Sequence, residues 1–371
     1  MNRKEKSILI LIDAFTQGGA QKVLLRLVPE WIALGYKVSL LLVQNSDKEL
    51  HIDDEIMTSI DLVRINASSI TDLYAYIKVF KYLVNLKPQI IQCHLYWAQI
   101  LGGILKVFAV NSQLVWVEHN TYINRTKFQW LLYRLLSRLT NEIIAVSKEV
   151  EVFLRQRMIS RIRFIPNPVS NTFRLVNTNE RNNSFIFIGR LNEQKNPKLC
   201  LDAFNYGLKN HIIPTDSTLK IVGDGPYLSE LQKLVCTYKL DENIEFLGFL
   251  SEFELAHILN ASKTLVSSSK YEGFALVRVE ALATGCTIVT TRTAGINGIL
   301  TEASDSEVLI NGIWLVEDDP ESMALAMGSS IQNSYWTIDG LLERSNSAAK
   351  FNPAKVAITY LVNLTNNERK D

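Results

Sequence analysis

The segment YEGFALVRVEALATG, residues 271–285, carries two carboxylates eight positions apart, Glu272 and Glu280. Glu272 follows the run KTLVSSS in a predicted loop, where a carboxylate can accept a hydrogen bond from a ligand hydroxyl. Glu280 stands where helical periodicity favours an apolar side chain, and a buried carboxylate is costly unless it is hydrogen-bonded. Paired hydroxyls such as those of a ribose would satisfy Glu280, and so would an arginine or a backbone amide. The segment alone leaves both interpretations open.

A helix is expected to follow Glu272, beginning near Phe274 and ending at Gly285. The main-chain amides at the start of a helix have no partner within it and favour an anion or a sugar oxygen. We therefore predict that successive amides point at a ligand, and they belong to Gly273, Phe274, Ala275 and Leu276.

Two cations follow another predicted strand in FIFIGRLNEQKN, residues 185–196. The strand delivers Gly189, and Arg190 and Lys195 come just past its carboxyl end. Two cations at this edge of a parallel sheet suit a diphosphate. A solvated basic loop is the alternative, and it is the favoured interpretation of this segment taken alone.

A glycine pair precedes the first long helical pattern. Gly18 and Gly19 lie in AFTQGGAQ, residues 14–21, after a predicted strand that ends at Asp13. Glycines allow close approach of a ligand to the backbone. Neither GxGxxG nor GxxxxGKS is present, so a plain turn at the start of a helix explains the pair equally well.

Short apolar runs alternate with longer runs of helical periodicity along the chain. This alternation predicts an α/β protein with parallel, doubly wound sheets, whose ligands bind beyond the carboxyl ends of the strands. The predicted strands are 7–13, 37–43, 89–95, 114–120, 142–147, 185–190, 218–225, 244–249, 263–269 and 286–292.

The polar, asparagine-rich stretch 165–184 divides this alternation into two halves and is predicted to be a linker. We therefore expect two domains of similar size, residues 1–168 and 169–371. The last helix, at about 352–366, is expected to pack back toward the first domain.

Composition and charge narrow the class of protein. Of the 371 residues 47% are hydrophobic and 21% are charged, which is typical of a globular protein rather than a disordered one. Residues 1–170 carry 21 Lys and Arg against 14 Asp and Glu, while the remaining residues carry 18 against 24. A basic first half suits an anionic surface or substrate, although chance scatter of surface charge remains the alternative.

Several localisation signals are missing from the sequence as given. Asp13 interrupts the first apolar run too early for a secretory signal, and Gln and His residues punctuate the uncharged span 88–105. Cys93, Cys200, Cys236 and Cys286 show no metal-binding spacing. We expect a reduced, cytoplasmic protein without structural zinc.

Together these segments resemble glycosyltransferase family 4, the retaining sugar-nucleotide enzymes with the GT-B fold, and in particular those that build bacterial polysaccharide and lipopolysaccharide. EGFALVRVE is similar to the Glu-x7-Glu motif of that family, and GGAQKVLLRL, EHN, AVSKEV, IPNPV, GRLNEQKN, GDGP and LGF look like its other landmarks. They span residues 18–285. Arg278 inside the motif is less usual, and the resemblance gives it no role.

The resemblance implies two Rossmann-like domains facing across a cleft, with the donor on the second. Arg190 and Lys195 would hold its diphosphate, Glu280 its ribose, and Glu272 a sugar hydroxyl. The amides of 274–276 would contact phosphate and sugar.

Three further roles follow from the same resemblance. Leu250 would lie near the base, and Gly18 and Gly19 would lie close to the diphosphate and sugar. His119 would sit near the reacting carbon, unless it is merely a hydrogen-bonded histidine at a strand end. Because Arg190, Lys195 and the helix amides supply positive charge, we expect neither a metal ion nor another cofactor.

The acceptor side is expected in the first domain. Residues 124–139 mix Arg125, Lys127, Arg134 and Arg138 with Phe128, Trp130, Leu131 and Leu135. Such a basic helix predicts peripheral contact with an anionic membrane and a lipid-linked or glycan acceptor, although core packing would explain the leucines equally well. Nucleic acid is not an expected partner.

Two other classes stay open. A sugar-nucleotide 2-epimerase shares the architecture, and a non-catalytic protein would bind the donor without transfer. The donor sugar is not specified by these residues, and UDP is favoured over GDP only because it is commoner in the family.

Overall fold

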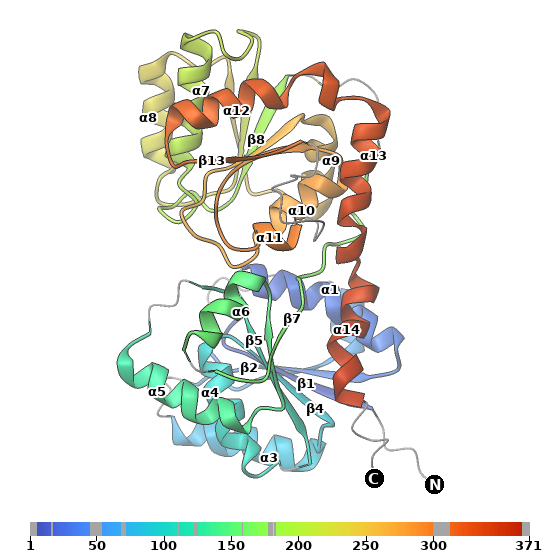
Figure 1. Ribbon diagram of the computed structural model, residues 1–371. Helices are drawn as coiled ribbons and strands as arrows, with labels where there is room; N and C mark the ends of the chain where they lie inside the picture. Colours follow the sequence, from blue (N-terminus) through green and yellow to red (C-terminus); the bar gives the residue numbers. More distant parts are fainter. Residues whose placement is uncertain are drawn as a thin grey trace. The chain divides into compact units, whose positions relative to one another are not determined.

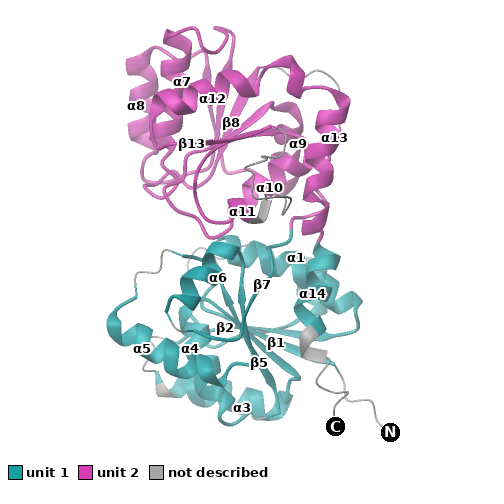
Figure 2. Ribbon diagram, in the orientation of Figure 1, with its two compact units in different colours: residues 1–168, 353–371 teal, residues 169–352 magenta. Residues whose placement is uncertain are grey.

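The computed structural model describes residues 6–15, 18–44, 54–67, 72–109, 111–121, 125–157, 159–176, 181, 183–299 and 312–365. The chain divides into two compact units (Figure 2). Unit 1 comprises residues 1–168 and 353–371, and unit 2 comprises residues 169–352.

Unit 1 contains a parallel sheet in the order β3-β2-β1-β4-β5-β6-β7 (Figure 1). The strands are β1 Ser7–Ile12, β2 Lys37–Leu42, β3 Asp61–Arg64, β4 Ile90–His94, β5 Gln113–Glu118, β6 Glu142–Ala145 and β7 Ile162–Phe164. The helices are α1 Gly19–Ala33, α2 Asp54–Ser59, α3 Leu73–Leu86, α4 Tyr96–Lys106, α5 Lys127–Leu136, α6 Lys148–Arg155 and α14 Pro353–Thr365, with a 3₁₀ turn at Ser137–Leu139.

Strands β1, β4 and β6 are buried along their whole length, as expected for a parallel sheet covered on both faces. The glycine pair in α4, Gly102 and Gly103, allows this helix to pack closely against its neighbours. A Cβ at Gly102 would collide with Cys93 Sγ on β4, and one at Gly103 would lie 2.9 Å from Leu136 Cβ. The uncharged span around this pair is therefore a strand followed by a closely packed helix, as predicted.

The last helix belongs to unit 1. Trp31 of α1 donates from Nε1 to the carbonyl of Ala357 on α14 at 3.3 Å, and its ring lies 5.9 Å from that of Tyr360. The predicted domain boundaries placed residues 353–371 in the second domain, whereas they belong to unit 1. The last helix nevertheless packs toward the first domain as predicted, because α14 lies against α1.

Unit 2 contains a second parallel sheet, in the order β10-β9-β8-β11-β12-β13. The strands are β8 Ser184–Ile188, β9 Thr218–Val222, β10 Ile244–Gly248, β11 Thr264–Ser267, β12 Thr287–Thr291 and β13 Ile313–Val316. The helices are α7 Pro197–Lys209, α8 Leu228–Tyr238, α9 Glu252–Ala261, α10 Leu276–Ala283, α11 Ile296–Ile299, α12 Pro320–Ser330 and α13 Ile338–Ser347, with 3₁₀ turns at Asn333–Tyr335 and Ala348–Phe351.

The order of both sheets reverses beside a central strand. In unit 2, β8 lies between β9 and β11, and in unit 1, β1 lies between β2 and β4. Ligands of doubly wound sheets bind at such switch points, beyond the carboxyl ends of the strands. The loops after β8 and β11, and those after β1 and β4, are thus where a site is expected.

Candidate active site

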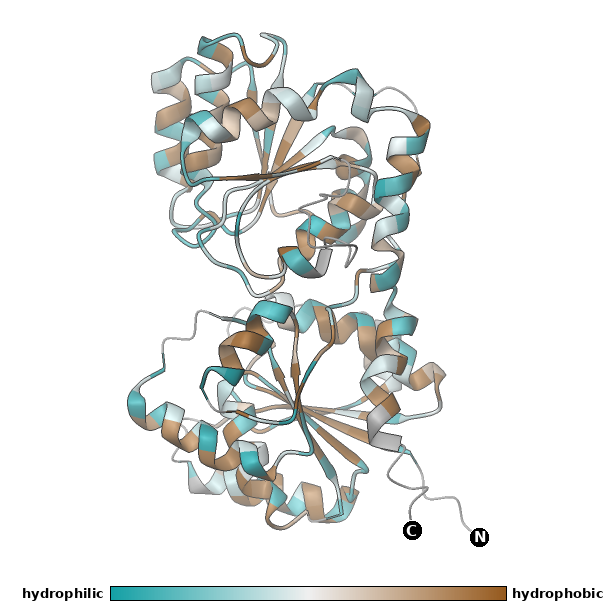
Figure 3. Cartoon of the chain, in the orientation of Figure 1, coloured by the Kyte–Doolittle hydropathy of each residue, from teal (hydrophilic) through white to brown (hydrophobic). Residues whose placement is uncertain are grey.

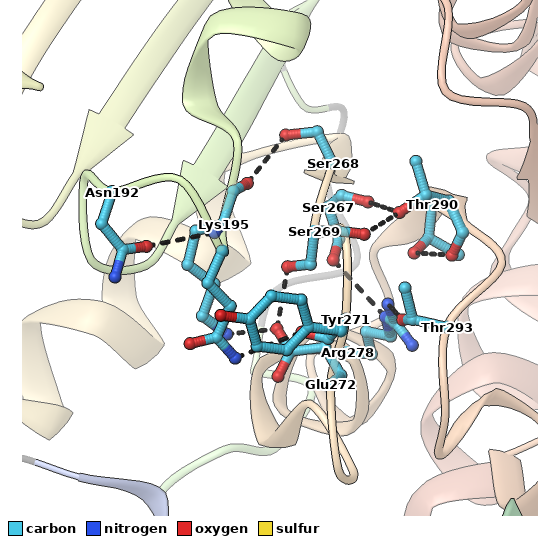
Figure 4. A network of polar contacts seen from close by, with 12 residues as sticks. Asn192, Lys195, Ser267, Ser268, Ser269, Tyr271, Glu272, Arg278, Thr290 and Thr293 are labelled. Atoms are coloured by element: carbon cyan, nitrogen blue, oxygen red, sulfur yellow. Dashed lines mark hydrogen bonds and ion pairs between the residues drawn. The ribbon is translucent and has the colours of Figure 1, made fainter. Parts of the chain in front are cut away.

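Lys195 and Glu272 form an ion pair at the carboxyl edge of the sheet in unit 2 (Figure 4). Lys195 comes from the loop between β8 and α7, and Glu272 comes from the loop between β11 and α10. Asn192 helps to shape the first loop, because its side-chain oxygen accepts from the amide of Lys195 at 3.1 Å. Two of the predicted site residues are therefore in direct contact.

The Glu272 carboxylate is buried and held from several sides. Ser269 Oγ donates to Oε1 at 2.8 Å, and Lys195 Nζ donates to the same oxygen. Burial by itself raises the pKa of Glu272, but the charges of Lys195 and Arg278 together with these hydrogen bonds bring it below its ordinary value. Glu272 is thus ionised at neutral pH.

Arg278 on α10 is wholly buried beneath this loop. Its Nε lies 3.4 Å from Ser267 Oγ, and its Nη2 donates to Thr293 Oγ1 (Figure 4). The side chain is thereby tied to the end of β11 and to the loop after β12.

The GDGP turn packs against the loop that carries the cations. A Cβ at Gly223 or Gly225 would collide with the carbonyl of Gly189 or of Leu191. Because both glycines also have positive φ angles, of 129° and 159°, this turn requires glycine twice. Arg190, between the two contacted carbonyls, is exposed.

The loop after β10 is attached to the same turn. The amide of Gly223 donates to the carbonyl of Gly248 at 2.7 Å. Leu250, two residues further along, is half-buried. It comes from a third loop at the carboxyl edge, as its predicted role near a base requires.

Helix α10 begins at Leu276, two residues later than predicted. Ala275 has φ 56° and ψ 69°, a left-handed conformation that cannot continue a right-handed helix. The amides of Gly273 and Phe274 therefore belong to the preceding loop rather than to the first turn. Glu280 lies inside α10 and is buried, as predicted.

In unit 1 two histidines meet at the carboxyl edge of the sheet. His119 follows β5 and its Nε2 lies 2.9 Å from Nδ1 of His94, the last residue of β4. Burial lowers the pKa of His119 to about 4. Burial and then the charge of His119 bring the pKa of His94 well below its usual value. Both rings are neutral at pH 7, so one donates to the other.

Asp13, after β1, lies at the same edge. It accepts from the amide of Ala98 at 2.6 Å and of Trp97 at 3.3 Å, at the start of α4. Burial raises its pKa to about 6 against the lowering effect of these two amides. This carboxylate therefore fixes the start of a helix beside the histidines.

The predicted glycine pair lies at the start of α1. Gly18 is the N-cap, with φ −131° and ψ 165°, and Gly19 is the first helical residue. Gly18 is half-buried and Gly19 is exposed. Residues 16–17 of the predicted loop lie outside the described residues.

Two protein families match consecutive parts of the chain. The family described as Glycosyltransferase Family 4 matches residues 17–173. The family described as Glycosyl transferases group 1 matches residues 170–350, which include every loop of the site in unit 2. The chain belongs to these glycosyltransferases.

Curated relatives of this glycosyltransferase include two enzymes named for lipid-linked acceptors. The UDP-Gal:alpha-D-GlcNAc-diphosphoundecaprenol alpha-1,3-galactosyltransferase of Escherichia coli is 29% identical over 68% of this chain and 73% of its own length. The GalNAc-alpha-(1->4)-GalNAc-alpha-(1->3)-diNAcBac-PP-undecaprenol alpha-1,4-N-acetyl-D-galactosaminyltransferase of Campylobacter jejuni is 24% identical over 74% of this chain and 76% of its own.

Among solved structures, Alr3699/HepE of Anabaena in complex with UDP matches with a TM-score of 0.80. It is 17% identical, and the match covers 97% of this chain and 100% of that one. The likeness, together with the two parallel sheets, shows that the glycosyltransferase has the predicted GT-B fold. Among the described residues, no helix has the length and apolar character needed to span a bilayer.

Three residues near the carboxyl edges of the two sheets were not predicted as site residues from the sequence of the glycosyltransferase. Arg278 was noted only as unusual, His94 only as a polar residue in an uncharged span, and Asp13 only as the end of a strand. His94 and Asp13 had an available signal, because each stands at the carboxyl end of a strand beside the switch point. Arg278 had none, because helical periodicity does not tell how far a long side chain reaches.

Proposed function

We propose that this glycosyltransferase is a retaining, metal-independent enzyme that moves a hexose or N-acetylhexosamine from a nucleotide sugar to a glycan or lipid-linked saccharide. The observation that carries this proposal is the Lys195–Glu272 pair, which places a cation and an ionised carboxylate side by side at the carboxyl edge. A cation suits a diphosphate and a carboxylate suits a sugar hydroxyl. UDP is the favoured nucleotide, since the curated galactosyltransferase relative is named for UDP-Gal and HepE was solved with UDP-glucose.

In this proposal Lys195 and the exposed Arg190 bind the diphosphate. Glu272 accepts from a hydroxyl of the donor sugar, and Glu280 accepts from the ribose. The amides of 273–276 contact phosphate and sugar, and Leu250 contacts the base. The support for these roles is that their loops lie at one edge of one sheet.

Unit 1 would supply the acceptor side. Gly18 and Gly19 would offer amides to the diphosphate and sugar, and His119 would lie near the reacting carbon. A neutral imidazole can bond a sugar hydroxyl without adding charge, which suits the lowered pKa of His119.

Retention would arise by attack on the same face of the sugar that the leaving group departs from. The acceptor oxygen forms a bond to C1 while the bond from C1 to the phosphate oxygen breaks. The acceptor proton passes to the departing phosphate, which leaves as the nucleoside diphosphate. Positive charge from Lys195 and Arg190 would stabilise the negative charge that develops on that phosphate.

Turnover is expected to survive chelation, because these side chains supply the charge that a metal ion would otherwise supply. With trace metal removed and EDTA present, we expect less than about a twofold change in the rate of nucleotide release. A tenfold or greater loss, restored by Mg²⁺ or Mn²⁺, would contradict the metal independence but not the transfer.

Helix α5 supports a proposed membrane-associated acceptor. Phe128, Leu131 and Leu135 are 72%, 53% and 49% exposed, so core packing within unit 1 does not account for them. Figure 3 shows hydrophobic and hydrophilic residues mixed along this helix. With Lys127 and Arg134 beside them, these side chains suit the surface of an anionic bilayer. Residue 124 of the predicted segment lies outside the described residues.

We therefore propose that the enzyme is cytoplasmic and binds peripherally at the inner face of the cytoplasmic membrane, and that it contributes to the synthesis of a cell-surface polysaccharide.

The double variant Phe128→Ser/Leu131→Ser is expected to weaken binding to anionic vesicles at low salt by about tenfold or more, because two apolar side chains no longer enter the bilayer. Co-sedimentation with vesicles measures this.

The matched control is Phe253→Ser, which removes an equally exposed phenylalanine (76%) from α9 in unit 2. Equal binding by wild type and by both variants would remove the proposed membrane contact through α5.

The test of the proposed function is nucleotide release from a panel of UDP- and GDP-sugars, with and without polyprenyl-diphosphate-linked amino sugars as acceptors. We expect one UDP-sugar to be consumed faster when an acceptor is present, with a glycosylated product. A nucleotide sugar epimeric at C2, formed without acceptor, would make the protein an epimerase instead. Tight donor binding without any turnover would make it a non-catalytic binder.

A further inference from the structure

The network around Glu272 holds two cations beside one carboxylate, and their exposure differs. The side chain of Lys195 is 22% exposed, whereas Arg278 is 0% exposed. Lys195 can therefore reach a ligand that arrives at the edge, and Arg278 cannot. Arg278 consequently has no direct role in the proposed binding of the donor.

Arg278 is fixed in place by the sheet. Its guanidinium bonds to Ser267 and Thr293. Thr291 Oγ1 lies 3.4 Å from the carbonyl oxygen of Ser267 and donates to the carbonyl of Ser269 at 2.6 Å, so it joins the two serines. Ser269 is also the residue whose hydroxyl binds Glu272. The cation thus stands on the same hydrogen-bonded framework as the carboxylate (Figure 4).

Donor binding poses an electrostatic problem for this network. If the proposed function is right, Lys195 must turn from Glu272 to the diphosphate. A buried carboxylate that loses its ion-pair partner is strongly disfavoured. A second cation that stays beside Glu272 would remove the problem.

We propose that Arg278 is a positioning residue that keeps Glu272 ionised and in place while Lys195 exchanges Glu272 for the donor diphosphate. This inference rests on the proposed function. It gives the residue a role that depends on its charge, since an apolar residue of similar length would fill the same space in α10.

The chain offers a matched control in Arg344. It too is fully buried in unit 2, but its hydrogen bonds go to the carbonyls of Gly285 and Tyr335, each at 2.8 Å. Both arginines can be replaced by methionine, which keeps most of the volume and removes the charge. A purely structural role would make the two variants behave alike.

The experiment is the pH profile of kcat/KM for both variants. Arg278→Met is expected to lower kcat/KM by about 10- to 100-fold and to move the acidic limb upward by about one pH unit. The charges of Lys195 and Arg278 lower the pKa of Glu272, while the neighbouring Lys270 pairs with Glu193 at the surface. The acidic limb therefore reports on this network. Arg278→Lys, which keeps the charge, is expected to return the limb to its place, and Arg344→Met is expected to leave it unmoved.

A double-mutant cycle separates this inference from the proposed function. In a Glu272→Gln background, Arg278→Met should cost less than about twofold, because no carboxylate is left to support. The same loss in both backgrounds, or an unmoved limb in Arg278→Met, would overturn the inference alone. Wild-type activity of Glu272→Gln would overturn the proposed role of Glu272 and the inference with it. If Arg278→Met yields no folded protein, Arg278→Gln provides the same charge removal and the same expected shift.

Discussion

Replacing Lys195 by methionine is expected to lower kcat/KM by about 10²- to 10³-fold, the loss typical of removing one group that stabilises developing negative charge. The ammonium group lies at the carboxyl edge of the second sheet and is held by Glu272. In the proposed reaction it meets the diphosphate as the glycosidic bond breaks. The loss should therefore fall on kcat as well as on donor affinity, which steady-state kinetics at varied donor concentration separate.

Lys270→Met is the control for this variant. Lys270 and Glu193 lie in the same two loops as Glu272 and Lys195, and they pair at 3.3 Å, but their side chains are exposed. Surface pairs contribute little, so we expect a change of less than about twofold. Similar losses in Lys195→Met and Lys270→Met would show that the variants disturb the loops rather than the chemistry.

Replacing His119 by phenylalanine is expected to lower kcat by about 10²-fold, the low end of what a positioned imidazole contributes. One ring nitrogen of His119 is engaged by His94, and the other is then the one that a ligand can meet. Phenylalanine keeps an aromatic ring but removes both the hydrogen bond to His94 and the proposed hydrogen bond to the ligand. Affinity for UDP, measured by calorimetry, should change by less than about twofold because His119 is proposed to lie near the reacting carbon of the sugar and not to contact the nucleotide.

His257→Phe, at an exposed histidine of α9, is the corresponding control and should behave as wild type. An unchanged kcat in His119→Phe would make His119 a structural histidine at the end of a strand. A weakened affinity for UDP would instead point to disturbed folding of the chain.

In unit 2 the sequence predicted that Arg190, Lys195 and Glu272 stand in loops that follow strands, and the structure has them in the loops after β8 and β11. The alternation of strands and helices predicts a parallel sheet, and ligands of such sheets bind beyond the carboxyl ends of the strands. Arg190, Lys195 and Glu272 could therefore be chosen as candidates from their positions after predicted strands. That Lys195 and Glu272 touch each other could not be predicted, since they are 77 positions apart and no pattern links two loops side chain by side chain.

The start of α10 was predicted two residues too early for a local reason. Alanine rarely adopts the left-handed backbone conformation, so the residue type gave no sign that Ala275 would take it and delay the start of the helix to Leu276. Strand β3 was not predicted because it has only four residues, begins with Asp61, ends with Arg64 and is nowhere fully buried. Short edge strands of this kind lack an apolar run.

The most direct test of the central claim is a proton NMR time course of the purified enzyme with α-linked UDP- and GDP-sugars and no acceptor. Water then serves as a slow acceptor, and the anomeric signals identify the configuration of the sugar when it is released. Release of the α-sugar from one UDP-linked donor, before mutarotation, is the predicted result and would establish a retaining glycosyltransferase. First appearance of the β-sugar, or of a nucleotide sugar epimeric at C2, would contradict it.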